Sequence, residues 1–250
     1  MIRTFRRSVA LAGALAITLG AAACSKDEAP AATSSSAATT TTTTAAPTTQ
    51  ASAPKASEVL SKVKANALAA KSAAFDGEIE QGGETMKIAF KGTADGKTSD
   101  IHLEQAAMGK VHLIAVDGQV YLQGDEKFWK SQGAPESVQK AGDKFVKAPA
   151  SASGMADQVN LKSFMDQAFG SLGNGDLDGK VRSDSVDGQD CWVLTDKSGK
   201  ENGALYVDKA SMQLVRFTGT KESPGQLTFS QWNEDLAITA PPADQIIQLQ

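Results

Sequence analysis

The sequence predicts an α+β fold in which a strongly curved antiparallel sheet of about ten strands is covered on its concave face by helices. Three observations favour this class. Apolar and polar residues alternate through short segments separated by glycine turns, two segments have the apolar spacing of amphipathic helices, and residues before 55 cannot form a core. An open antiparallel sheet of this size curls, and its apolar face needs a cover.

Residues 1–23 have the composition of a secretory signal peptide. A basic start precedes an uncharged apolar run at residues 9–23, which is shorter than the ~20 residues that a membrane-spanning helix needs. The segment LGAAAC that ends at Cys24 resembles a bacterial lipobox, which implies cleavage before Cys24 and its acylation, for example with palmitate. A plain signal-peptidase site that leaves a free thiol is the alternative. We expect an extracytoplasmic protein, anchored to the outer face of the cell membrane through Cys24.

Residues 24–54 form the predicted lipidated N-terminus and tether. They are almost wholly Ala, Thr, Ser and Pro, with six consecutive threonines at 39–44, and such a composition stays disordered because it cannot bury a core. A coil of this length spans roughly 30 Å, so the tether would hold the domain away from the membrane. The composition of the threonine run also fits O-glycosylation.

Residues 55–250 are enough for one domain. It begins with an expected amphipathic helix at 55–71, where Val59, Leu60 and Val63 share one face. A second helix is expected at 160–172, with an asparagine cap before it and a glycine after it.

Between the helices, four turns at residues 82–83, 95–96, 106–108 and 117–118 predict one continuous strand register. That register places Phe75, Phe90, Ile101, Leu113 and Leu122 in one row on an apolar face. A slip of one residue at any turn would move its apolar set to the other face, so the agreement among the turns supports the register.

After the second helix, strands are expected at 181–186, 190–196, 204–208, 212–219 and 226–232, and the whole is predicted to be a meander. Cys191 lies in one of these strands, where a buried, inert thiol is expected.

Motifs for catalysis are scarce. The sequence has no G-x-S-x-G, H-E-x-x-H, C-x-x-C or phosphate loop, and the S-x-x-K spacings at 61–64 and 137–140 lack companion motifs. Three of the 25 basic residues precede residue 24, so 22 basic residues face 29 acidic ones in the rest, which argues against a nucleic-acid partner. We expect no enzymatic activity and no cofactor.

Two patterns are candidates for metal sites. His102 and His112 fall opposite each other on the polar face, but without a convincing third ligand a solvated pair is the preferred interpretation. Residues 174–179 (NGDLDG) have the alternating oxygen ligands of a weak calcium loop, yet the closing position is Ser185 rather than glutamate. No metal site is therefore predicted.

The runs LYVD at 205–208 and LVR at 214–216, together with the acylated cysteine, the tether, the leading helix and the long meander, resemble the LppX/LprG-type lipoproteins of actinobacteria. The resemblance covers residues 55–250 and implies a LolA-like half-barrel with an apolar cavity for lipid acyl chains. It also implies that the protein carries or presents a lipid or glycolipid within the cell envelope, with an envelope lipid transporter as a possible partner.

The residues themselves favour the same use. The helix at 55–71 offers alanines, and Gly77 lies among bulky neighbours, so packing between helices and sheet is expected to be incomplete. A filled core would instead indicate a scaffold or sensor lipoprotein. We expect a monomer whose candidate cavity is lined by the apolar residues Phe75, Ile79, Ile88, Phe90, Leu103, Leu113, Leu122, Phe164, Trp192, Leu205 and Leu214.

Overall fold

The computed structural model describes residues 53–148, 160–170, 172 and 177–247. All of them lie in one unit, Gln50–Gln250. The predicted signal peptide, Cys24 and the tether lie outside the described residues and stay predictions. Of the calcium-loop candidate at residues 174–179, which was not favoured, residues 174–176 also lie outside the described residues. Within the described ranges, the helices are too short or too polar to cross a membrane.

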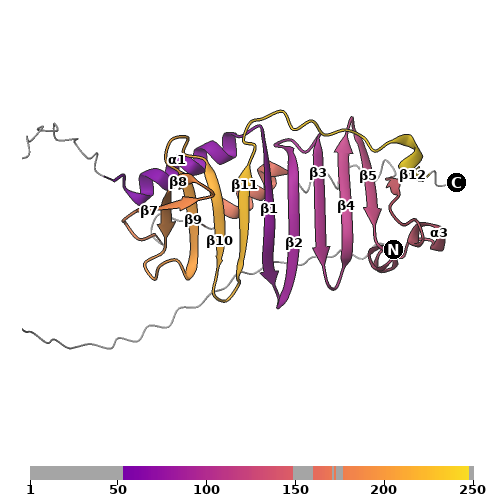
Figure 1. The fold of residues 1–250 in the computed structure, drawn as a ribbon, viewed down its shortest axis with the longest axis horizontal. Coiled ribbons are helices and arrows are strands. Elements are labelled where there is room, and N and C mark those ends of the chain that lie inside the picture. The colour runs from indigo at the N-terminus through magenta and orange to yellow at the C-terminus, as the bar shows by residue number, and fades with distance from the viewer. Residues whose placement is uncertain (1–52, 149–159, 171, 173–176, 248–250) are drawn as a thin grey trace, which may run out of the picture. The chain divides into compact units, whose positions relative to one another are not determined.

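One curved, open sheet of twelve strands dominates the domain (Figure 1). Its strand order is β12-β6-β5-β4-β3-β2-β1-β11-β10-β9-β8-β7, and neighbours are antiparallel except for the parallel pair β12 and β6. The strands are β1 (Ser72–Gln81), β2 (Glu84–Thr93), β3 (Ser99–Gln105), β4 (Gly109–Val116), β5 (Gln119–Gly124), β6 (Phe145–Lys147), β7 (Arg182–Val186), β8 (Gln189–Thr195), β9 (Asn202–Asp208), β10 (Leu214–Thr220), β11 (Gly225–Ser230) and β12 (Ile246–Ile247). The predicted fold class is confirmed.

The register predicted from the turns is also confirmed for β1 to β5. Phe75 pairs with Phe90, Phe90 with Ile101, Ile101 with Leu113, and Leu113 with Leu122. The turn residues therefore determine the pairing of this half of the sheet, because each turn leaves only one alignment that keeps the apolar residues on one face.

The predicted single meander is wrong in its connectivity. β1 pairs with β11 as well as with β2, so the sheet consists of two meanders joined edge to edge. Gly77 makes this junction possible: its φ is +153°, and a Cβ there would lie 1.9 Å from the carbonyl oxygen of Gln226 in β11. The glycine thus permits a close approach of two backbones, whereas the sequence predicts that it leaves space beneath a helix.

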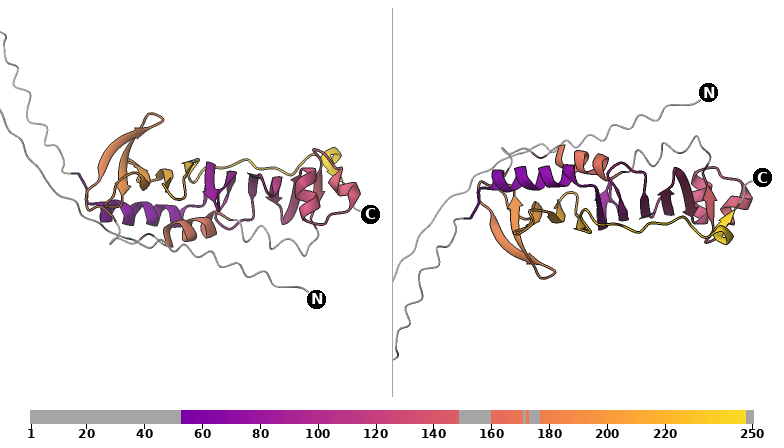
Figure 2. Two further views of the ribbon diagram at one scale, coloured as in Figure 1. Left: turned by 90° about the horizontal axis from the view of Figure 1, so that it is seen from below. Right: turned by 90° about the horizontal axis from the view of Figure 1, so that it is seen from above.

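Two helices lie on the same side of the sheet, α1 (Ala56–Ala69) and α5 (Leu161–Gly170), as Figure 2 shows. They match the predicted helices with slightly shorter bounds. α5 begins after Asn160, whose side-chain oxygen accepts a hydrogen bond from the Ser163 backbone N–H at 2.7 Å. The helices contact each other, and Lys64 of α1 donates to the carbonyl oxygen of Phe169 at 3.2 Å.

Short elements between residues 126 and 147 and at the C-terminus were not predicted. They are α2 (Glu126–Ser131), α3 (Glu136–Gln139), β6, the 3-10 turn η2 (Ala243–Gln245) and β12. Each has fewer than seven residues, so no apolar period is visible in the sequence. α2 is defined by its cap: the Asp125 carboxylate accepts hydrogen bonds from the N–H groups of Phe128 at 2.8 Å and Lys110 at 3.0 Å.

Candidate functional site

The apolar face gathers every residue predicted to line a cavity into one hydrophobic cluster. Five of them are buried: Phe75, Phe90, Leu113, Leu205 and Leu214. The other six are partly buried and pack against that core: Ile79, Ile88, Leu103, Leu122, Phe164 and Trp192. The structure brings the predicted residues together, while their role as a lipid cavity stays a prediction.

An aromatic stack joins α5 to the middle of this face. The ring of Phe75 lies 4.4 Å from Phe164 of α5, 4.9 Å from Phe90 of β2 and 5.3 Å from Phe229 of β11, measured between centroids. Phe229 in turn stacks on Trp232 at 5.9 Å. These contacts seat α5 over the junction between the two meanders.

Cover over the apolar face is uneven. α1 and α5 pack over the side formed by β8 to β11 and β1, and Phe128 of α2 belongs to a second cluster that includes Val111 and Leu122. Between these two covered regions lie Ile79, Ile88 and Leu103 of β1, β2 and β3, which remain partly exposed. We call these three residues the apolar strip.

The opposite, polar face of β1 to β5 contains a groove of 1220 Å³, bounded at one end by residues 139–143. In strands β1 to β5, the side chains that line this groove are mainly those that point away from the apolar face. Its charged side chains are six carboxylates and three lysines: Asp76, Glu78, Glu104, Asp125, Glu126, Asp143, Lys87, Lys110 and Lys140. This groove was not predicted, because its wall comes from α3 and the loop after it.

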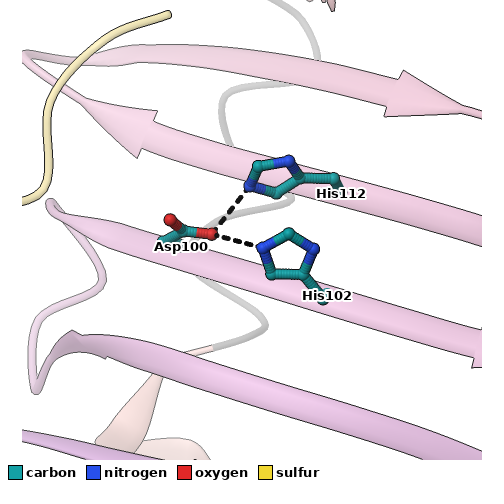
Figure 3. A group of neighbouring side chains, drawn as sticks. All are labelled: Asp100, His102 and His112. Carbon is teal, nitrogen blue, oxygen red and sulfur yellow. Dashed lines mark hydrogen bonds and ion pairs between the residues drawn. The ribbon is translucent and has the colours of Figure 1, made fainter. Parts of the chain in front are cut away.

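His102 and His112 line this groove, and Asp100 joins them (Figure 3). The two histidines are directly opposite in β3 and β4, and their rings stack with centroids 3.7 Å apart. The Asp100 Oδ1 atom lies 2.7 Å from Nε2 of His112 and 3.2 Å from Nε2 of His102. The histidine pair was predicted from the sequence, but Asp100 was not, although its position two residues before His102 in one strand puts both side chains on the same face.

Burial and charge act in opposite directions on this cluster. Burial raises the pKa of Asp100, but the hydrogen bond from His112 and the nearby positive charges outweigh it, so the pKa lies below its ordinary value. Burial lowers the pKa of His102, and His112 lowers it further, while Asp100 opposes both. Near neutral pH the carboxylate is therefore ionised and His102 is neutral.

The remaining sequence motifs have structural explanations. Lys64 of the first S-x-x-K spacing donates a hydrogen bond to the backbone carbonyl oxygen of Phe169, and Lys140 of the second forms an ion pair with Glu136 at 2.5 Å. Cys191 is fully buried, which confirms its expected burial, and burial raises the pKa of its thiol; its inertness stays a prediction. Asp178, at the described end of the calcium loop, pairs with Arg182 at 3.0 Å.

Comparison with known proteins identifies similarity in structure but not in sequence. No family model matches the chain, and no curated protein matches it. Similar solved structures include LprF from Mycobacterium bovis, at 11% identity and a TM-score of 0.46, covering 74% of this chain and 96% of that one. They also include the lipoprotein LppX from Mycobacterium tuberculosis, at 11% identity and a TM-score of 0.43, covering 73% of this chain and 99% of that one.

LppX is a lipoprotein of the LppX/LprG type that the sequence resembles. An uncharacterized conserved protein from Thermus thermophilus is also similar, at 14% identity and a TM-score of 0.34, covering 77% of this chain and 98% of that one. At these identities the likeness concerns the fold alone.

Proposed function

We propose that this protein is a membrane-anchored, non-catalytic lipoprotein that binds the acyl chains of a lipid or glycolipid on its apolar face and carries or presents it within the cell envelope. The observation that carries the proposal is the apolar strip. Ile79, Ile88 and Leu103 continue the buried core sideways but remain partly exposed, which is the arrangement that a hydrocarbon chain can cover.

The energetics favour a shielded carrier over free transfer. Exposing a sixteen-carbon chain to water costs about 12 kcal/mol of free energy, at ~0.8 kcal/mol for each methylene. A row of branched aliphatic side chains can offset that cost by contact area alone, so binding requires no ionisable group in the strip. The acyl chains proposed on Cys24 and the tether would keep the domain beside the membrane, where it could act as a monomer and deliver lipid to an envelope transporter.

Lipid extraction tests the proposal directly. The full chain is purified from membranes of an actinobacterial host, and bound lipid is extracted and quantified by mass spectrometry against protein. Ile88→Gln places an amide in the apolar strip, whereas Ala89→Gln adds the same group on the opposite face of the same strand.

Because burying an isoleucine side chain is worth about 1.5–3 kcal/mol, Ile88→Gln is expected to weaken the lipid affinity roughly tenfold or more and so to lower the amount of lipid that co-purifies. Ala89→Gln should retain the occupancy of the wild type. Absence of lipid from the wild-type protein, or equal lipid in both variants, would contradict the proposal.

The second candidate is a scaffold or sensor lipoprotein with a filled core, and the burial of Phe75, Phe90 and Leu113 favours it. This candidate predicts that the purified protein carries no stoichiometric lipid. It also predicts that Ile88→Gln changes the stability of the protein but not its lipid content. For either candidate, the intact mass of the membrane-bound chain measures the acyl groups on Cys24, and Cys24→Ser should release the protein from the membrane.

A further inference from the structure

We propose that Asp100, His102 and His112 form a binding site for one divalent transition-metal ion, with zinc as the reference ion, on the polar face of the sheet. This site is independent of the proposed lipid function, because its side chains point to the face opposite the apolar strip.

The geometry is close to what zinc requires. One imidazole nitrogen from each histidine and one carboxylate oxygen all lie within 4.8 Å of one another, and the Asp100 Oδ1 is 2.7 Å and 3.2 Å from the two Nε2 atoms. With zinc–ligand bonds of about 2.0–2.1 Å, tetrahedral coordination places ligand atoms about 3.3 Å apart. The two rings are stacked at an interplanar angle of 21°, so binding of the ion would require the imidazoles to rotate until both Nε2 atoms point to one centre (Figure 3).

The backbone holds the three residues in place. Asp100 and His102 alternate on β3, and His112 is directly opposite His102 on β4, between the flanking strands β2 and β5. His112 is further oriented by Phe145, whose ring meets it edge-on at a centroid distance of 5.1 Å. A site on the interior strands of a sheet is more rigid than one on a loop, so ligand binding costs little conformational entropy.

Access and charge also favour a cation. The side chain of His102 is 56% exposed, while those of Asp100 and His112 are 32% and 18% exposed, so a bound ion could keep a water ligand toward the solvent. The groove beside the site has six carboxylates and three lysines, and this negative excess raises the local concentration of cations. Two imidazoles and one carboxylate favour zinc, copper or nickel over calcium or magnesium, which prefer oxygen ligands.

Calorimetric titration of the metal-stripped full chain in detergent with zinc chloride tests the site. We expect one zinc ion bound for each chain. His102→Gln should weaken this binding by about a hundredfold or more, because even loss of an outer-shell partner costs 10–100-fold. Glu104→Gln is the matched control: Glu104 lies on the same face of β3 but is not one of the three ligands, and it pairs with Lys110 at 3.5 Å. Its loss removes one charge from the groove and should therefore weaken zinc binding far less than His102→Gln does.

Two further measurements make the outcome unambiguous. Cobalt substitution should produce visible absorption bands of a low-symmetry site in the wild type and in Glu104→Gln, but not in His102→Gln. Thermal unfolding without metal checks that His102→Gln, a change at the most exposed ligand, folds as the wild type does. The proposal is overturned if the wild type binds no zinc, if His102→Gln binds it equally well, or if binding is lost only when Cys24 is replaced by serine.

Discussion

Replacing Gly77 with alanine should separate the two halves of the sheet. The added Cβ would lie 1.9 Å from the Gln226 carbonyl oxygen, which is 1.5 Å closer than the 3.4 Å at which ordinary van der Waals contact begins. Backbone atoms cannot rotate away as a side chain can, so β11 must move and part of the β1–β11 pairing between Ala74↔Ser230 and Ile79↔Gly225 must be lost.

The size of the effect follows from two contributions. Holding a non-glycine residue at a φ of +153° costs on the order of 1–3 kcal/mol. Loss of about two ladder hydrogen bonds adds about 0.5–1.5 kcal/mol each. The total of roughly 2–6 kcal/mol corresponds to a fall in Tm of about 4–24 °C, at about 2–4 °C for each kcal/mol in a domain of this size.

Gly83→Ala is the matched control. Gly83 also has a positive φ, +81°, but a Cβ there would meet no heavy atom within 4 Å. Only the backbone cost of about 1–2 kcal/mol applies. Thermal unfolding of lipid-free protein, followed by circular dichroism, compares the two variants, and hydrogen exchange should show selective loss of protection in β1 and β11 for Gly77→Ala. If Gly83→Ala is as destabilising, the account of the junction is wrong.

Three other perturbations have defined outcomes. Phe75→Ala removes the centre of the aromatic stack, so urea unfolding should show a loss of about 3–5 kcal/mol in the free energy of unfolding; a loss below about 1 kcal/mol would show that the stack is loosely packed. Asp125→Ala removes the cap of α2 and should cost ~1 kcal/mol by the same assay, with faster hydrogen exchange at the Phe128 amide; an unchanged rate would contradict the capping role. The hydrogen bond from the Ser211 backbone N–H holds the pKa of Asp208 below its ordinary value. The stability that this carboxylate contributes is therefore present above the unfolded pKa of ~3.9 and is lost as the pH falls through the folded pKa. Asp208→Asn should lose less stability than the wild type on acidification below about pH 4, and parallel profiles of stability against pH would refute this.

Much of the fold could be predicted because its information is local. Each turn between β1 and β5 joins strands that are adjacent in the sequence, and a register is correct only if it puts Phe75, Phe90 and Leu113 on one face. The helices α1 and α5 are long enough to show an apolar period. The same alternation placed His102 and His112 opposite each other, and applied once more it could have added Asp100.

By itself, the sequence determined which residues form the apolar face, how β1 to β5 pair and which histidines meet. Only the tertiary structure decided that β1 pairs with β11, that α3 and the loop after it wall a groove on the polar face, and how far each apolar residue is covered. The physical reason is the range of the interactions. Alternation and turns act over a few residues, whereas the contact of Gly77 with Gln226 joins segments about 150 residues apart in the chain, and only the collective packing of the core brings them together.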